Sequence, residues 1–461
     1  MKALNKDKIV LNLLKLCAII ALTWPLWVHG FPLLYSDSGT YLVAAKIGEI
    51  PIDRPYAYSY FLVFFAKLFG VYFLPVVQAV MVIYLGERFL KRTVFRSLPK
   101  WSGTVLFIAL GAFTGLPHLV CQMMPDLFTP FLFLLIWDLM QKLGLRESLL
   151  SIAFLLFIVA MHSSHLLLAL ILIPCLALAR YYLDRDKKII NKLALLIGVW
   201  MIIPIVNFTH AGRFYLSDSS RVFFAASLHN AGILTPWLER HCGEEQAPEF
   251  LCANQEQLKG MDGNGILWGS DILMDSSCLS QSGWGYCWRV RNEELGPFMK
   301  NWWKDDISRD AYLQYAWKAT WQQTFDYGIG MISSQKEGSA PYTVLDHHYP
   351  KDLKRYKSSD QYDHDLFFHG QSKTQWWTVL LSLIALLFLV LIGMRNGRWK
   401  KEWTMMLICL FVFLLANAAV CGILSNPVDR YQARVIWLIP FLTMTLGMSV
   451  FRNDTSKKVE Q

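Results

Sequence analysis

The sequence predicts an all-α polytopic membrane protein with about ten transmembrane helices and one large mixed insert on the extracytoplasmic side. Hydrophobic residues make up 54% of its 461 residues and charged residues only 17%. A water-soluble core cannot accommodate this composition without a large apolar surface. Apolar stretches of about 20 residues, the length that spans a bilayer, recur along the chain. Lys and Arg gather in short clusters between these stretches, which indicates alternating sidedness.

The apolar stretches set the positions of the expected helices. Ten crossings are predicted at 9–29, 73–90, 102–118, 127–143, 149–161, 166–183, 193–208, 376–394, 404–424 and 434–451. The first of them follows three lysines and is open to a second interpretation, a cleaved signal peptide. Its length, the lysine at position 15 and the lack of a small-residue cleavage site favour a retained helix.

The basic clusters orient the predicted helices. With ten crossings both termini lie on one side, together with the clusters at 88–100, 180–192, 395–401 and 452–458, so that side is assigned to the cytoplasm. The loop 208–373 contains 16 Lys and Arg against 21 Asp and Glu, whereas the rest of the chain contains 28 against 14. The formal charge of +9 therefore reflects topology, and no nucleic-acid partner is inferred from it.

The nine cysteines divide in the same way. Five lie in or beside apolar helices, where cysteine acts as a small hydrophobe. The other four, Cys242, Cys252, Cys278 and Cys287, lie in the loop, and in an oxidising compartment they predict two disulfides with three connectivities open. A four-cysteine zinc site is the alternative, but the short paired spacing typical of such sites is absent.

The chain is thus expected to have three parts: an N-terminal transmembrane block (1–207), an extracytoplasmic disulfide-containing insert (208–373) and a C-terminal transmembrane block (374–461). Within the insert, aromatic and charged residues alternate from Gly296 to Phe325. This pattern predicts an amphipathic helix that lies on the bilayer interface or packs under the insert.

The first outer loop has polar residues where they are costly. Asp37 follows the first helix, and Arg54 stands one loop further on. An acidic and a basic group at the water boundary together favour a substrate site. The structural alternative is that Asp37 caps a short helix near Ser38 and Arg54 extends toward lipid phosphate.

Three further outer segments contain such residues. Asp126 lies between the third and fourth predicted helices, where it could also serve as an N-cap. His162 and His165 share a tight turn and could contact metal or phosphate, although a solvated polar turn has the same pattern. Arg430 and Arg434 precede the last crossing on the outer side, against the usual charge bias, and therefore require an anionic partner such as phosphate.

Taken together, these segments resemble the GT-C superfamily of membrane glycosyltransferases, in particular the branch of protein O-mannosyltransferases and aminoarabinose transferases. The resemblance spans most of both membrane blocks, through short motifs in a shared order. The matching residues are Asp37 with Tyr41, Arg54-Pro55 with Tyr58, Pro125-Asp126, and Arg430-Tyr431 with Pro440. Two features depart from the family: Ser38 follows Asp37 where many members have a second acid, and the His162 and His165 region replaces a common lysine.

The resemblance implies an inverting transfer of a sugar from a polyprenyl-phosphate carrier to a lipid, glycan or protein acceptor at the outer membrane face. Asp37 would be the general base, and Asp126 would orient the acceptor or help to bind a metal. Arg54 and Arg430 would stabilise the leaving phosphate. Substrate phosphate contacts are also expected of Arg434 and Tyr431, and further substrate contacts of Tyr41, Tyr58, His162, His165, His347 and His348.

Such a reaction requires no nucleotide or other cofactor, and a divalent metal is left open. The implied location is an integral, multi-pass protein of the bacterial inner membrane, in contact with membrane lipid and with its large loop in the periplasm or outside the cell.

Two other functions stay open. An O-antigen polymerase or ligase would use loop residues such as Arg289, Arg291 and Asp346 with His347 and His348. A transporter or flippase of lipid-linked saccharides would be expected to show internal repeats, which are not evident here.

Overall fold

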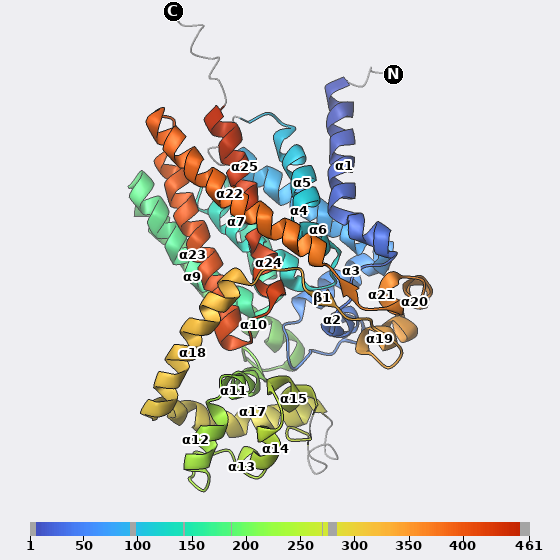
Figure 1. The fold of residues 1–461 in the computed structure, drawn as a ribbon, viewed down its shortest axis with the longest axis vertical. Coiled ribbons are helices and arrows are strands. Elements are labelled where there is room, and N and C mark those ends of the chain that lie inside the picture. The colour runs from blue at the N-terminus through green and yellow to red at the C-terminus, as the bar shows by residue number, and fades with distance from the viewer. Residues whose placement is uncertain are drawn as a thin grey trace, which may run out of the picture.

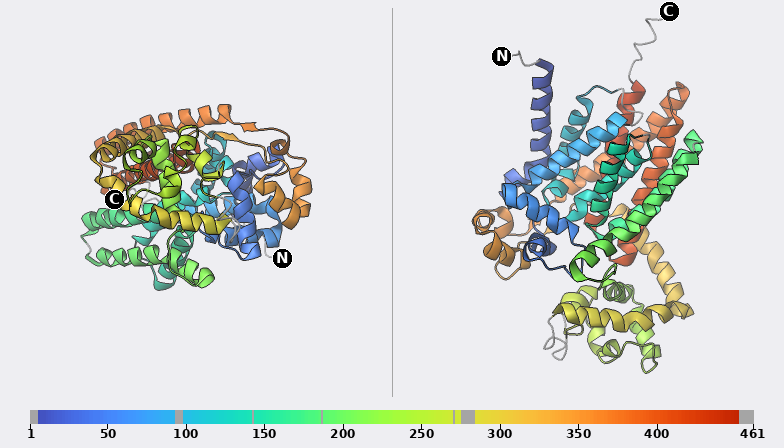
Figure 2. Two further views of the ribbon diagram at one scale, coloured as in Figure 1. Left: turned by 90° about the horizontal axis from the view of Figure 1, so that it is seen from below. Right: turned by 180° about the vertical axis from the view of Figure 1, so that it is seen from behind.

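The computed structural model describes residues 6–92, 98–141, 143–185, 187–269, 271–274 and 284–451. Long helices form a bundle, and smaller helices cover one end of it (Figure 1). The start of α1 and the end of α25 lie at the opposite end (Figures 1 and 2). The all-α character predicted from the composition is confirmed.

Seven helical segments of the described chain are long and apolar enough to cross a membrane. They comprise α1 (Lys6–His29), α4 (Leu74–Arg92), α9 (Ser163–Asp184), α10 (Leu195–Ala211), α22 (His369–Arg395), α23 (Lys401–Leu424) and the consecutive pair α24 (Asp429–Ile436) and α25 (Leu438–Phe451). Short turns of 3-10 helix precede α4 and α10, namely η1 (Val71–Phe73) and η3 (Lys187–Ala194). The chain is therefore a multi-pass membrane protein.

The other three predicted crossings are helical but shorter. They correspond to α5 (Ser102–Phe113) followed by α6 (Leu116–Cys121), to η2 (Pro125–Phe128) followed by α7 (Thr129–Leu139), and to α8 (Leu145–Val159). The 12 residues of α5 extend about 18 Å at 1.5 Å per residue, well short of a bilayer core. The apolar run continues past a break at Gly115, whose N–H donates to Gln375 Oε1. Seven spans are thus shown by length and composition, and the three shorter segments are not confirmed as full crossings.

The first outer loop is folded into two helices, α2 (Ser36–Ile47) and α3 (Ala57–Phe69), which pack against each other. The Ser38 hydroxyl accepts a hydrogen bond from Tyr35 N at the start of α2. Asp37 lies one residue earlier, within the first turn, and its side chain points to Arg54. Ser38 therefore takes the capping role that was the structural alternative for Asp37.

The insert is helical where a mixed fold was expected, and it has two parts. The first contains α11 (Ser220–Asn230), α12 (Leu234–His241), α13 (Glu249–Cys252), α14 (Gln255–Lys259), α15 (Gly263–Trp268), α17 (Trp284–Asn301), η4 (Trp302–Lys304) and α18 (Asp306–Phe325). These helices enclose a core of their own that includes Trp237, Trp288 and Phe298. Among the described residues, the only strands are two antiparallel pieces of two residues each, in the second part.

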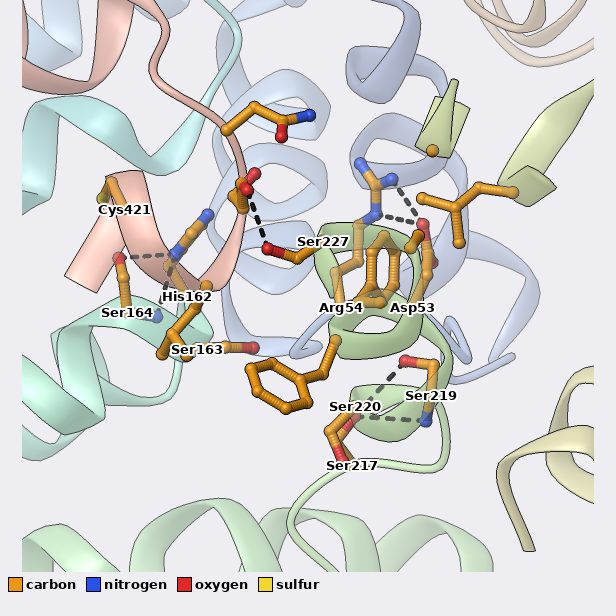
Figure 3. A pocket seen from close by; sticks show the side chains of 18 of the residues that line it. Asp53, Arg54, His162, Ser163, Ser164, Ser217, Ser219, Ser220, Ser227 and Cys421 are labelled. Atoms are coloured by element: carbon orange, nitrogen blue, oxygen red, sulfur yellow. Dashed lines mark hydrogen bonds and ion pairs between the residues drawn. The ribbon is translucent and has the colours of Figure 1, made fainter. Parts of the chain in front are cut away.

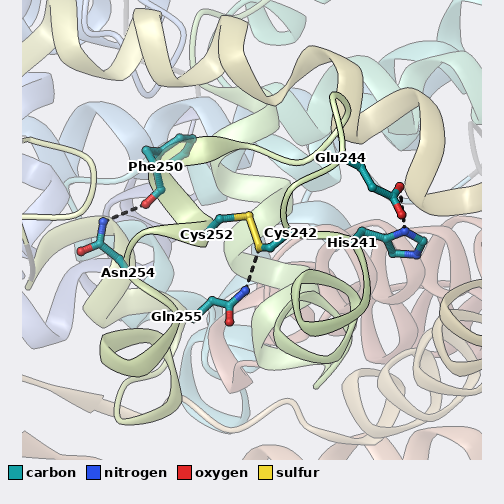
Figure 4. Close-up of a disulfide and its surroundings, with 7 residues drawn as sticks. All are labelled: His241, Cys242, Glu244, Phe250, Cys252, Asn254 and Gln255. Atoms are coloured by element: carbon teal, nitrogen blue, oxygen red, sulfur yellow. Dashed lines mark hydrogen bonds and ion pairs between the residues drawn. A yellow bond between two sulfur atoms is a disulfide. The ribbon is translucent and has the colours of Figure 1, made fainter.

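A disulfide between Cys242 and Cys252 joins the end of α12 to α13 (Figure 4). Cys287 on α17 is also disulfide-bonded, while Cys278 lies outside the described residues. The prediction of disulfides in the insert is thus confirmed for the first pair.

The second part of the insert packs beside the first outer loop. It contains β1 (Met331–Ile332), α19 (Ala340–His348), α20 (Pro350–Tyr356), α21 (Asp360–Asp363) and β2 (Leu366–Phe367). Helix α19 lies against α2 so closely that a Cβ at Gly39 would be 2.7 Å from the Ala340 carbonyl carbon. This contact fixes the start of α2, where Asp37 lies.

The expected single amphipathic helix over 296–325 is two helices. Helix α17 ends at Asn301, and α18 starts after Asp305, whose carboxylate accepts from Ser308 N. Asp305 is a favourable N-cap residue, and it starts a new helix in a new direction. Helix α18 then packs along the end of α23.

Candidate functional site

A cavity of about 860 Å³ lies between the ends of the membrane helices and the first part of the insert. Figure 3 shows its walls: Asp53 and Arg54 face His162 and Ser164 across it, and serines of the insert close another side. Ser227 of α11 ties the two walls together, because its hydroxyl lies 3.0 Å from Ile423 O and 3.1 Å from Ser425 O at the end of α23. The first outer loop, the turn before α9 and the segment before α24 therefore line one cavity together with the insert.

Arg54 and two carboxylates form the charged group on the bundle side. The Arg54 guanidinium lies 3.1 Å from Asp37 Oδ1, and its Nε donates to Asp53 Oδ2 at 2.9 Å. The Asp37 side chain is 37% exposed, whereas that of Asp53 is 4% exposed. Asp37 is thus the carboxylate available to a ligand, and Asp53 holds Arg54 from behind.

Two predicted tyrosines lie under this group. Tyr41 lines the cavity, and the Arg54 guanidinium carbon lies 5.1 Å from the centre of its ring. Burial raises the pKa of Tyr41, so its phenol stays protonated at neutral pH. Tyr58 is buried below Tyr41 and donates its hydroxyl to Gln78 Oε1 at 3.2 Å. Tyr58 therefore supports the wall and does not line it.

Asp126 and Arg434 form a buried ion pair behind the cavity. Arg434 Nη1 donates to Asp126 Oδ1 at 2.9 Å, and the two side chains are 0% and 2% exposed. Burial opposes the ionisation of Asp126, but the charges of Arg430 and Arg434 outweigh it and hold the pKa of Asp126 below its usual value. The structure thus places Asp126 away from the cavity surface, where its carboxylate orients arginines.

Arg430 lies beside this pair. Its Nε is 3.6 Å from Asp126 Oδ2, and its guanidinium carbon lies 4.6 Å from the ring centre of Tyr35 and 5.4 Å from that of Tyr431. Tyr431 lines the cavity, while Arg430 lies behind it. The two late arginines, expected to contact phosphate, instead form the back of the wall in this structure.

The two histidines of the turn before α9 have different environments. His162 lines the cavity, and its Nδ1 lies 2.8 Å from Ser164 Oγ. Burial, with the charge of Arg434, lowers the pKa of His162 to about 4, so its imidazole is neutral at pH 7. His165 is buried in the bundle, where Nε2 contacts Thr129 Oγ1 at 2.9 Å and Nδ1 contacts Ile158 O at 2.8 Å. Both its ring nitrogens are satisfied, so His165 serves packing in the bundle.

The other predicted loop histidines lie elsewhere. His347 and His348 end α19, beside α2 but outside the cavity lining. Lys46 Nζ donates to the His348 carbonyl at 2.7 Å, which fixes that helix end. Of the residues predicted to contact substrate, Tyr41, His162 and Tyr431 therefore line the cavity, whereas His347 and His348 do not.

The insert side of the cavity was not predicted. Arg221 of α11 lines it, and its Nη1 donates to Asn292 O at 3.0 Å. In the part of the chain that the structure describes, no carboxylate forms an ion pair with Arg221. Trp268 and Asn264 of α15 add an aromatic ring and an amide. Single residues in a long insert give no sequence signal for this position, because the fold alone brings them over the helix ends.

The cavity has distinct polar and apolar regions. Leu167 of α9 with Val420 and Leu424 of α23 form an apolar wall at the membrane end. Among the described residues, no three His, Cys, Asp or Glu side chains are close enough to hold a metal ion together. The two lining carboxylates, Asp37 and Asp53, are both engaged with Arg54. The arrangement suits a ligand with an anionic group, hydroxyl groups and an apolar tail.

No family profile, curated protein or solved structure matches this chain.

Proposed function

We propose that this chain is a GT-C-type glycosyltransferase, which transfers a sugar from a polyprenyl-phosphate carrier to a lipid, glycan or protein acceptor at the outer face of the membrane. The observation that carries the proposal is the position of Asp37 and Arg54. An accessible carboxylate and a guanidinium lie 3.1 Å apart in a cavity between membrane helices and a soluble insert. A lipid-linked sugar and a water-soluble acceptor can meet at such a place.

The donor phosphate requires cations. Arg54 alone is a weak anion site, because Asp37 and Asp53 together outweigh its charge. Arg221 brings a second guanidinium to the same cavity without a carboxylate partner among the described residues. We therefore assign the phosphate to Arg54 and Arg221, since a planar guanidinium can hold two phosphate oxygens at once.

The apolar wall supports a lipid carrier. Leu167, Val420 and Leu424 belong to the membrane-spanning helices α9 and α23 and also line the cavity. The first isoprenoid units next to the phosphate would lie against them. A water-soluble nucleotide sugar would find no polar partner on this wall.

In the reaction, the acceptor hydroxyl attacks the anomeric carbon as its proton passes to Asp37. The bond between that carbon and the phosphate oxygen breaks, and the electron pair leaves with the carrier phosphate, whose growing charge the two arginines stabilise. Direct displacement inverts the anomeric configuration. Arg430, Arg434 and Asp126 act as positioning residues, because they fix Tyr431 and the turn at Ser164.

The proposed location is the inner membrane of a bacterium, with both termini in the cytoplasm and the insert in the periplasm or outside the cell. Two observations support this orientation. The segment at 395–401 lies at the bundle end away from the insert (Figure 1). This segment is basic, and cytoplasmic loops usually carry an excess of Lys and Arg. The insert contains a disulfide, which persists in oxidising compartments.

The test is turnover by purified protein in lipid nanodiscs with a polyprenyl-phosphate-linked sugar as donor and a hydroxyl-bearing lipid, glycan or protein as acceptor. Release of polyprenyl phosphate is measured for the parent chain, for Asp37→Asn and for Glu49→Gln, an exposed acid at the other end of α2 that does not line the cavity. Asp37→Asn should reduce turnover by about 100-fold or more, the loss expected when a general base is removed. Glu49→Gln should leave it unchanged.

Unchanged turnover by folded Asp37→Asn protein would refute the assignment of the base. Loss of turnover in His347→Ala together with unchanged turnover in Asp37→Asn would favour a polymerase or ligase that uses loop residues. Sugar movement across vesicle membranes without release of polyprenyl phosphate would instead identify a transporter.

A further inference from the structure

Helix α18 has an exposed apolar face that no other described element covers. Leu313, Trp317, Trp321 and Phe325 follow one another at four-residue spacing, so they lie along one side of the helix. Trp317 is 68% and Phe325 67% exposed, and the other two are also exposed. The Trp321 and Phe325 rings stack at 5.7 Å, which gives a continuous aromatic surface. An apolar stripe of this size on a soluble surface marks a contact with another phase or molecule.

The opposite face of α18 sets the depth of this stripe. A Cβ at Gly422 of α23 would be 2.8 Å from Ala319 O, so the two backbones are in direct contact there. Gln323 Nε2 donates to Val428 O at 2.9 Å, and Gln323 Oε1 accepts from Val428 N at 2.9 Å. One candidate span ends at Leu424 and the next begins at Asp429. The second half of α18 is therefore fixed at the level where the helices leave the membrane.

Tryptophans at the start of α22 also indicate that the second half of α18 lies at the membrane boundary. Trp376 and Trp377 are exposed near the start of α22, one turn beyond Ser372, whose hydroxyl accepts from Ile329 N just after α18. Tryptophan is enriched where membrane helices meet the headgroups. The first half of α18 is different, because it exposes Asp306 and Asp310 and leads down to the insert (Figure 1). The helix changes from charged to aromatic as it approaches the membrane boundary.

We propose that the face formed by Leu313, Trp317, Trp321 and Phe325 lies in the headgroup region of the bilayer on the insert side, with α18 as an interfacial helix. The partner is lipid because the stripe is continuous in depth with the lipid-facing ends of α22 and α23. Lys318 lies on the flank of the stripe and is exposed, as expected of a basic residue that reaches lipid phosphate. This inference does not depend on glycosyl transfer.

The interfacial contact also positions the cavity. Tyr312 of α18 contacts Phe224 of α11 edge to face at 5.9 Å, and Phe224 lines the cavity. The Tyr315 hydroxyl donates to Gly422 O at 3.3 Å. A helix held at the bilayer surface therefore fixes the insert wall over the helix ends.

The experiment uses nitroxide labels at single cysteines in the full chain, reconstituted in nanodiscs of phosphatidylcholine and phosphatidylglycerol. The variants are Trp317→Cys and Leu313→Cys, with Asp306→Cys as the matched control on the charged end of the same helix. All are made in a Cys17→Ser background and labelled without reductant, since Cys17 is the exposed free cysteine among the described residues and the disulfide must stay intact. Collision rates with oxygen, which partitions into lipid, are compared with those of a water-soluble nickel chelate.

The labels at positions 317 and 313 should collide more often with oxygen than with nickel, and by at least about threefold relative to the label at 306. A water-like ratio at both positions would overturn the inference. Low collision rates with both reagents would overturn it as well, because they would show that protein covers the stripe. Two stripe positions are used so that a folding defect in one variant does not decide the result.

Discussion

The buried pair between Asp126 and Arg434 allows a quantitative test of the cavity wall. With Arg430 the group has two cations and one anion, and the Asp126 and Arg434 side chains are 2% and 0% exposed. Asp126→Asn leaves two buried guanidinium groups without a counter-ion. Breaking a buried ion pair in this way costs about 3–5 kcal/mol of unfolding free energy.

Arg434→Met should lower the free energy of unfolding by less than Asp126→Asn does. It removes hydrogen bonds to Asp126, Asn417 and Ser164, but Asp126 keeps Arg430 at 3.6 Å. The expected cost is about 2–3 kcal/mol, from orphaned buried acceptors. In the Asp126→Asn background the same change removes a repelling cation, so the double variant should cost less than the sum by at least about 1.5 kcal/mol.

The assay is unfolding in mixed micelles with increasing SDS fraction, followed by tryptophan fluorescence. Asp310→Asn is the control, since it removes an exposed carboxylate 3.6 Å from Arg309 and should change the unfolding free energy by less than about 0.5 kcal/mol. Strict additivity of the two changes, or an Asp126→Asn cost as small as that of the control, would refute the buried network.

Three further predictions concern the first outer loop and the insert. Gly39→Ala should lower the unfolding free energy by about 1–3 kcal/mol and reduce turnover, because its Cβ would be 2.7 Å from the Ala340 carbonyl carbon. Gly370→Ala is the control: its Cβ meets no atom within 4 Å, so it should change neither quantity. Burial and the carboxylate of Asp429 raise the pKa of Asp326 from 3.8 to about 7. Between these two pH values the folded state holds a proton that the unfolded chain has lost. The free energy of unfolding should therefore fall as pH rises from about 4 to 7. Asp326→Asn should remove this fall and exceed the parent in thermal stability at pH 8; a parallel pH profile in both proteins would contradict the pairing. Replacing both cysteines of the disulfide between α12 and α13 by serine should cost about 2–3 kcal/mol and speed proteolysis of the insert, with unchanged digestion as the contrary result.

The sequence predicted the membrane block well, because long apolar runs have one physical explanation. Seven of the ten expected crossings have helices of sufficient length. The other three are not confirmed as crossings, because apolar runs such as the one around Gly115 pass through breaks in the helix without a change in hydropathy. At that break the Gly115 N–H donates to the side chain of Gln375, a residue 260 positions away, which no local pattern reveals.

Part of the candidate site was predicted from the membrane side on which its residues lie. Asp37, Arg54, Tyr41, His162 and Tyr431 line one cavity as their shared sidedness indicated. Sidedness gives the membrane face but not the depth of a side chain.

Depth separates the remaining predicted residues from the cavity. Arg434 and Asp126 are charged residues of outer segments, like Asp37 and Arg54, but they are buried behind the cavity wall. Arg221 and Trp268 escaped prediction because only the folded insert brings them to the cavity.

A density map of the chain in nanodiscs with added polyprenyl phosphate would show whether the cavity receives a polyprenyl-phosphate-linked sugar. We expect phosphate density within hydrogen-bond distance of the Arg54 and Arg221 guanidinium groups, with the isoprenoid chain beside Leu424. Phosphate density at another site together with an empty cavity, or binding that survives Arg54→Ala with Arg221→Ala, would contradict it.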